Sequence, residues 1–199
     1  MRLRFPLLVT FACVLPALAQ TPERLGTVSF PVSCVASQQA AINRGVALLH
    51  DFWYEESQRQ FAQVVEADPS CAIAHWGIAM SLYHQIWNRP SEAVIAQGRS
   101  ELDKANGANT EREKDYISAL RTFYAPGALE YQQRIDQYSV AMRELHARYP
   151  DDVDATAFYA LSLLADVAPD DTSLNKEHQA LALLTPLLEK YPDHPGLAL

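Results

Sequence analysis

Apolar residues recur at steps of three and four positions along most of this chain, which is the spacing of one face of an α-helix. The first such stripe lies between Ser37 and His50 and consists of Ala41, Ile42, Gly45, Leu48 and Leu49. A second amphipathic segment, residues 55–67, follows after a short break. Ser37 is expected to cap the first helix, because serine favours the N-cap position. The pattern therefore predicts two helices packed as an antiparallel pair.

Three further helix pairs are predicted downstream. Their expected boundaries are residues 72–84 and 91–105, residues 110–124 and 129–149, and residues 152–166 and 175–190. Thr110 and Glu113 have the spacing of a capping box, and residues 106–109 are a turn cluster. The chain has only seven glycines and almost no alternating β pattern. The predicted fold class is therefore all-α, with about four antiparallel helix pairs.

Residues 38–69 carry a set of spacings that is typical of a repeated helix pair. Counting from Gln38, six characteristic positions hold Gly45, Leu48, Ser57, Phe61, Val64 and Pro69. Gly45 would let the two helices approach, Ser57 adds little bulk opposite it, and Phe61 would fill the wedge between them. This pattern resembles the tetratricopeptide repeat (TPR). Its second half recurs as Tyr138, Met142, Leu145 and Pro150, and again as Ala180, Leu184, Leu187 and Pro192. The resemblance implies a TPR-like α-solenoid, an architecture that serves as a binding scaffold.

The first nineteen residues have the organisation of a signal peptide. Arg2 and Arg4 form a basic start, residues 7–15 are apolar, and residues 17–19 end in a small-x-small pattern, so cleavage is expected after Ala19. A lipid anchor at Cys13 is the alternative. Residues 20–36 would then form an extended N-terminal arm and residues 37–199 the repeat domain. No other apolar run is long enough to span a bilayer. We expect an exported protein, periplasmic or extracellular.

The charge of the chain narrows the classes of partner. The formal net charge is -8, from 16 basic and 24 acidic residues. Removing the leader takes away two basic residues and leaves 14 minus 24, or -10. An acidic protein of this kind is not expected to bind nucleic acid or anionic membranes.

Two cysteines remain once Cys13 leaves with the leader. Cys34 precedes the first predicted helix, and Cys71 follows the proline that ends the second. In an oxidising compartment a disulfide between them is the natural interpretation. In the chain-entropy model, closing a loop of this size stabilises the fold by about 4 kcal/mol. Two free thiols, or a pair of metal ligands, are the alternatives.

A longer stretch of sequence resembles a group of exported bacterial TPR proteins with a cysteine-flanked first repeat. The resemblance covers residues 30–87 and rests on the motifs at residues 33–34, 48–52, 54–56, 68–69, 71–72 and 76–80, together with Phe61. It implies the same family and the same compartment. Members of that group continue through further helical repeats, and residues 194–199 look like the opening of a fifth pair. We therefore expect the sequence to be truncated at its C-terminus.

The TPR resemblance also implies where a ligand binds, because the first helix of each pair lines the concave groove. The residues expected at the inward positions of the first two repeats are Gln39, Ile42, Val46, Leu49 and His50, and Ile73, Trp76, Met80, Tyr83 and His84. This set is apolar and aromatic, which suits a protein or peptide partner with hydrophobic anchors. The alternative is that these side chains pack between helices as ordinary core.

His50 and His84 occupy the same slot in adjacent repeats, so a shared metal ion is conceivable. A zinc site generally needs three or four protein ligands, and the spacing shows no third. No metal or cofactor is therefore assigned, and the other histidines, including His194, receive no role.

No catalytic motif is present in the sequence, so a non-enzymatic protein is expected. The predicted function is an exported TPR scaffold that mediates protein–protein interactions through the concave groove of its first repeats. One alternative is a metal- or small-ligand-binding accessory protein that uses His50, His84 and Trp76. Another is a structural repeat segment of a larger envelope protein.

Overall fold

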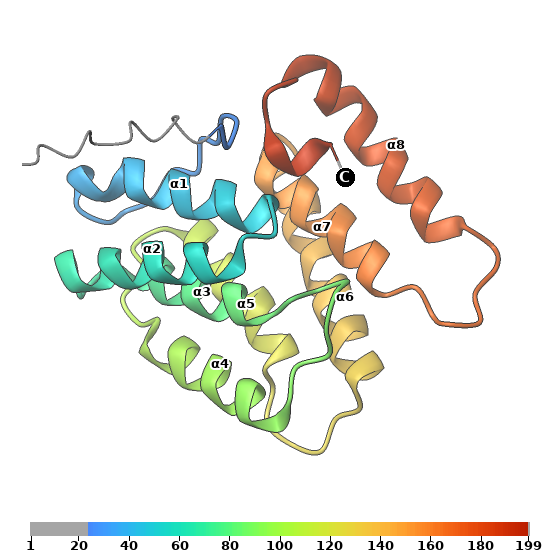
Figure 1. The fold of residues 1–199 in the computed structure, drawn as a ribbon, viewed down its shortest axis with the longest axis horizontal. Coiled ribbons are helices and arrows are strands. Elements are labelled where there is room, and N and C mark those ends of the chain that lie inside the picture. Colours follow the sequence, from blue (N-terminus) through green and yellow to red (C-terminus); the bar gives the residue numbers. More distant parts are fainter. Residues whose placement is uncertain (1–23, 199) are drawn as a thin grey trace, which may run out of the picture.

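The computed structural model describes residues 24–198, which fold into helices without any strand (Figure 1). The helices are α1 (Gln39–His50), α2 (Tyr54–Ala67), α3 (Ala72–Leu82), α4 (Glu92–Lys104), α5 (Glu111–Phe123), α6 (Tyr131–Arg148), α7 (Val153–Ala165) and α8 (Asn175–Lys190). Two short 3₁₀ helices, η1 (Ala36–Gln38) and η2 (Pro195–Leu197), lie near the two ends. The helices pack in adjacent pairs, which confirms the predicted all-α, solenoid-like fold. The predicted signal peptide and its cleavage site lie outside the described residues.

Helix ends follow the predicted boundaries closely where a polar side chain caps the helix. Ser91, Thr110 and Asp152 each accept a hydrogen bond from the backbone N–H three residues later. The capping prediction for Ser37 was wrong: this residue lies inside η1, and its side chain does not cap α1. Helix α3 ends at Leu82, two residues before the predicted boundary.

The predicted wedge between the first helices is present. Phe61 is fully buried, and a Cβ atom added to Gly45 would lie 2.7 Å from its ring. Ser57 Oγ donates a hydrogen bond of 3.0 Å to the carbonyl of Gly45. The Phe61 ring also contacts Gly77 on α3, so closely that an added Cβ would lie 2.4 Å from the ring. One aromatic side chain therefore sets the approach of three helices.

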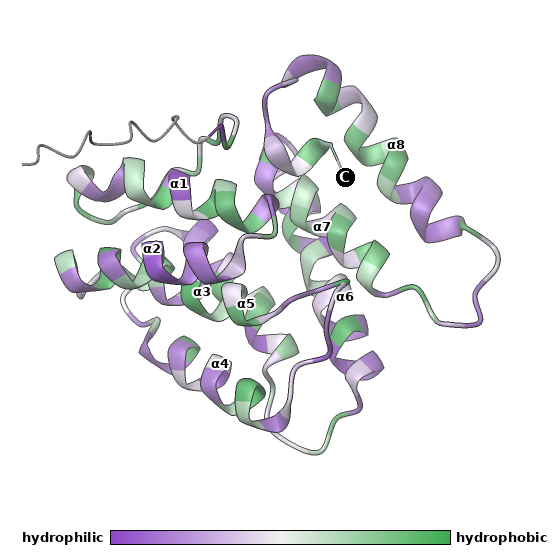
Figure 2. Ribbon diagram, in the orientation of Figure 1, coloured by the Kyte–Doolittle hydropathy of each residue, from purple (hydrophilic) through white to green (hydrophobic). Residues whose placement is uncertain are grey.

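Burial is uneven along the array. Ten of the thirteen residues of α7 are buried, whereas only two of the sixteen residues of α8 are. Figure 2 shows the same contrast in composition, since α7 is largely hydrophobic and α8 mixes hydrophilic and hydrophobic residues. No helix in the described part of the chain combines the length and the hydropathy that a membrane span requires.

The two ends of the described chain meet. Residues 24–35 have no regular secondary structure, and we refer to them as the arm. The backbone N–H of Thr27 in the arm donates to the carbonyl of Asp193, at 2.8 Å. Beyond Asp193, η2 packs against α1, α7 and α8. Figure 1 shows this C-terminal turn folded back toward the end of α1.

Cys34 and Cys71 lie at disulfide distance, with their Cα atoms 4.9 Å apart. The bond ties the end of the arm to the start of α3. Asp68 supports the same junction, because its carboxylate accepts the backbone N–H of Val35 at 2.9 Å. The hydrogen bonds from Ser70 and Val35 keep the pKa of Asp68 below its usual value.

Candidate functional site

The residues predicted to line the groove are mostly inside the protein. Eight of the ten are buried: Ile42, Val46, Leu49, His50, Ile73, Trp76, Met80 and Tyr83. Gln39 and His84 are partly exposed. The eight buried side chains therefore pack inside the protein, as in the alternative that the sequence left open.

What covers the groove is the arm itself. Phe30 is fully buried and stacks on Trp76, with the ring centroids 5.5 Å apart and nearly parallel. It also meets the edge of Tyr116 on α5 at 5.0 Å. The Gln39 side chain donates to the carbonyl of Phe30 at 2.7 Å, and the Asn43 side chain accepts the backbone N–H of Phe30 at 3.1 Å. A segment with an aromatic anchor thus covers residues that were predicted to line the groove, and that segment belongs to the same chain.

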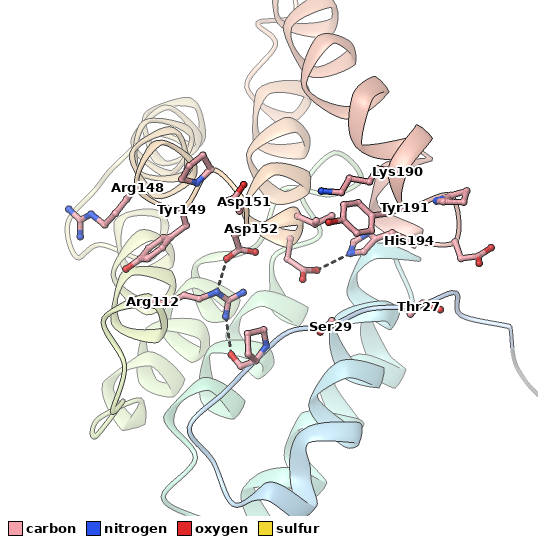
Figure 3. A pocket seen from close by; sticks show the side chains of 16 residues that line it. Thr27, Ser29, Arg112, Arg148, Tyr149, Asp151, Asp152, Lys190, Tyr191 and His194 are labelled. Carbon is pink, nitrogen blue, oxygen red and sulfur yellow. Dashed lines mark hydrogen bonds and ion pairs between the residues drawn. The ribbon is translucent and has the colours of Figure 1, made fainter.

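An open cavity remains where the arm approaches the C-terminal turn. Its volume is about 930 Å³, within the range of ligand sites in proteins. It is lined by Thr27, Ser29, Pro31, Arg112, Arg148, Tyr149, Pro150, Asp151, Asp152, Val153, Asp154, Lys190, Tyr191, Pro192, Asp193 and His194. Figure 3 shows that these side chains come from the arm, from α5, from the end of α6 and the turn before α7, and from the end of α8 and the segment after it.

The arm forms one wall of this cavity because its residues alternate. Val28 and Phe30 are buried, whereas Thr27, Ser29 and Pro31 are exposed and line the cavity. Such alternation is expected of an extended segment, in which successive side chains point to opposite sides.

Arg112 holds the wall in place. Its Nε donates to Asp152 Oδ2 at 2.6 Å, and its Nη1 donates to the carbonyl of Pro31 at 3.0 Å. The guanidinium also lies 4.2 Å from the centre of the Phe30 ring. Burial alone would lower the pKa of Arg112, but the hydrogen bond that Arg112 donates to Asp152 and the nearby charges of Asp152 and Asp154 together raise it. A permanently charged arginine therefore links α5, α7 and the arm.

A buried polar cluster lies at the inner end of the cavity and consists of His50, Asp154 and His194. His50 Nε2 lies 3.0 Å from Asp154 Oδ1, and the two residues are 104 positions apart in the sequence. His194 Nε2 lies 3.3 Å from the same oxygen, the contact drawn as a dashed line from His194 in Figure 3. The side chains of all three are at most 6% exposed.

The ionisation of Asp154 follows from this environment. Burial would raise the pKa of its carboxyl, but the contacts with His194 and His50 outweigh burial and lower the pKa to about 2. Asp154 is therefore a buried carboxylate at neutral pH. Buried charges are normally paired or bound to a metal ion.

Only part of this site could be anticipated. His50 was singled out, but its expected neighbour His84 instead stacks on Tyr54, with ring centroids 4.3 Å apart. Asp154 and His194 were missed because nothing in local spacing connects them to His50. His194 and Gly196 lie in the segment that looked like the start of a fifth pair, and this was the only sequence signal nearby.

Comparison with known proteins does not assign the chain, since no family model, curated protein or solved structure matches it. The function must therefore be argued from the site.

Proposed function

We propose that this protein is an exported TPR scaffold that binds an extended peptide segment of a partner protein in the cavity beside its arm. The observation that carries the proposal is the cavity of about 930 Å³ beside the arm, a segment that itself packs on the helices through Phe30. Repeat arrays of paired helices bind partners on this face.

The lining of the cavity suits a peptide. Pro31, Pro150 and Pro192 together with Tyr149 and Tyr191 supply flat apolar contacts, and aromatic residues supply much of the energy of protein interfaces. Lys190 and Asp193 lie at the exposed border and can contact the polar groups of a peptide backbone. This proposed site differs from the groove of the first two repeats that the sequence predicted, because it lies beside the last helix pair.

Export and TPR membership are parts of the same proposal. They are supported by the leader-like sequence of residues 1–19, by the cysteine pair at disulfide distance and by the packing of Phe61 between Gly45 and Gly77. A disulfide is stable in an oxidising compartment such as the periplasm.

Selection from a peptide library displayed on phage tests this proposal. The immobilised protein should enrich a family of related peptides. Ser29→Trp places a large side chain in the cavity without disturbing a buried residue, because Ser29 is exposed and lines the cavity. This variant should lose at least tenfold in affinity for the enriched peptides.

Ser100→Trp is the matched control, because Ser100 is exposed on α4 and does not line this cavity. It should bind the enriched peptides like the wild type. If the wild type enriches no peptide family, or if both tryptophan variants bind equally, the cavity is not a peptide site.

A further inference from the structure

We propose that His50, Asp154 and His194 form a binding site for a divalent transition-metal ion of the zinc type, with one coordination position facing the cavity. The argument for the metal site does not rest on peptide binding: it follows from donor type, geometry, burial and access.

The donors are the ones that such ions prefer. Two imidazole nitrogens and one carboxylate oxygen converge, with the candidate ligand atoms all within 4.8 Å of one another. Imidazole and carboxylate ligands suit zinc and its neighbours, whereas calcium and magnesium prefer sites built from oxygen alone.

The distances match a metal site as well as a hydrogen-bonded one. With metal–ligand distances of about 2.0–2.1 Å and tetrahedral angles, neighbouring ligand atoms lie about 3.3 Å apart. The observed separations from Asp154 Oδ1 are 3.0 Å to His50 Nε2 and 3.3 Å to His194 Nε2. The third separation, between the ligand atoms of the two histidines, is within 4.8 Å, so the three donors already lie close enough to converge on one ion.

An unpartnered donor atom points to the same conclusion. His194 Nε2 is buried and lacks a hydrogen-bond partner, because its approach to Asp154 is within ion-pair distance but outside hydrogen-bonding geometry. A buried polar atom without a partner is costly. A metal ion between Nε2 and Oδ1 would satisfy it.

The surrounding structure holds the cluster in place. The ring of His50 stacks on Phe158, with centroids 4.4 Å apart. A Cβ atom added to Gly196 would lie 2.4 Å from Nδ1 of the same ring, so only glycine fits there. Asp154 is in the first turn of α7, and His194 is the N-cap of η2. The three ligands thus come from the first helix pair, the last pair and the C-terminal turn.

Access to the cluster is provided by the cavity. Asp154 and His194 both line it, so an ion can reach them, and a water molecule in the cavity can supply a fourth ligand. Catalytic zinc sites have this arrangement, with three protein ligands and a fourth position that water or substrate can occupy.

The proton on His194 has to move when the ion binds. His194 Nδ1 accepts the N–H of Gly196 at 3.2 Å, which places the ring proton on Nε2 in the metal-free protein. Coordination through Nε2 shifts this proton to Nδ1, and the N–H of Gly196 then loses its acceptor. Metal binding should therefore change the environment of the Gly196 amide.

The test uses protein treated with a chelator and then titrated with Zn²⁺ by calorimetry at pH 7.5. One Zn²⁺ should bind per chain, and Mg²⁺ should give no comparable binding. Co²⁺ should produce the visible absorption bands of a four-coordinate site, and the Gly196 amide signal should shift in NMR spectra.

His194→Gln should reduce Zn²⁺ affinity at least tenfold and abolish the Co²⁺ bands. His84→Ala is the matched control and should leave both unchanged, because His84 lies outside the cluster. Circular dichroism establishes that each variant is folded.

If His194→Gln does not fold, His50→Gln takes its place, and the wild-type Co²⁺ spectrum and Gly196 shift decide the question. Absence of stoichiometric Zn²⁺ binding in the wild type, or unchanged binding in a folded His194→Gln protein, would overturn the proposal.

Discussion

At the scale of single residues, the packing around Phe61 shows which contacts the sequence pattern predicted and which it did not. The spacing identified Gly45, Ser57 and Phe61 as a wedge, and the structure confirms each contact. Gly77 was not part of that prediction, yet it lies even closer to the Phe61 ring than Gly45 does. The Phe61 ring therefore leaves no room for a side chain at either Gly45 on α1 or Gly77 on α3.

Gly77→Ala is expected to destabilise the protein. The new Cβ would lie 2.4 Å from the Phe61 ring, and overpacking of this kind costs about 1–3 kcal/mol. Urea denaturation followed by circular dichroism measures the loss. The same change in a Phe61→Leu background should cost less, since the smaller side chain leaves room for the methyl group. Equal costs in the two backgrounds would show that Phe61 is not the obstacle.

His50 gives the opposite lesson at this scale. Its position in the repeat was recognised, but its chemical surroundings were not, because they come from α7 and η2. A histidine can be placed on a helix from local sequence, whereas its partners depend on which distant segment reaches that helix.

At the scale of elements, the arm is the unexpected part of the fold. It was predicted to be an extended arm, and its described residues 24–35 have no regular secondary structure. Its packing was not anticipated: Phe30 is fully buried against Trp76 and Tyr116. The hydrogen bonds from Ser33 to Glu113 extend the contact to α5, with distances of 2.9 and 2.5 Å. The arm therefore completes the core as another helix would.

Phe30→Ala should cost about 3–5 kcal/mol, the usual effect of removing a fully buried aromatic ring. Because Phe30 covers Trp76, the tryptophan should also become accessible to a fluorescence quencher. Denaturation and quenching can be measured on the same samples. Val35→Ala provides a control, since Val35 is 50% exposed and should change neither quantity measurably. A loss below about 1 kcal/mol would mean that the arm is not part of the core.

At the scale of the whole molecule, the two ends distinguish this protein from a simple repeat array. In such arrays each pair contacts only its neighbours. Here the arm contacts the segment after α8, and η2 contacts α1. Because of these contacts, the stability of the arm and α1 depends on the stability of the segment after α8, and the reverse.

Gly196→Ala should disturb both ends together. The added methyl group would lie 2.4 Å from His50 Nδ1, so η2 must move away from α1. Hydrogen exchange should become faster at the end of α1 and at the start of α7, while α4 stays unchanged. Ala198→Ser is the control, because Ala198 is exposed beside the same turn. Faster exchange limited to residues 195–198 would argue against coupling of the ends.

The sequence by itself determined the helices, their pairing, the wedge around Phe61 and the closeness of Cys34 and Cys71. These features depend on residues within one or two repeats, where spacing along the chain fixes which side chains face each other. Only the tertiary structure decided that the arm fills the groove and that His50 meets Asp154 and His194 beside an open cavity. The reason is physical. Contacts across more than a hundred residues depend on the accumulated rotation between successive helix pairs, and no local pattern specifies that sum.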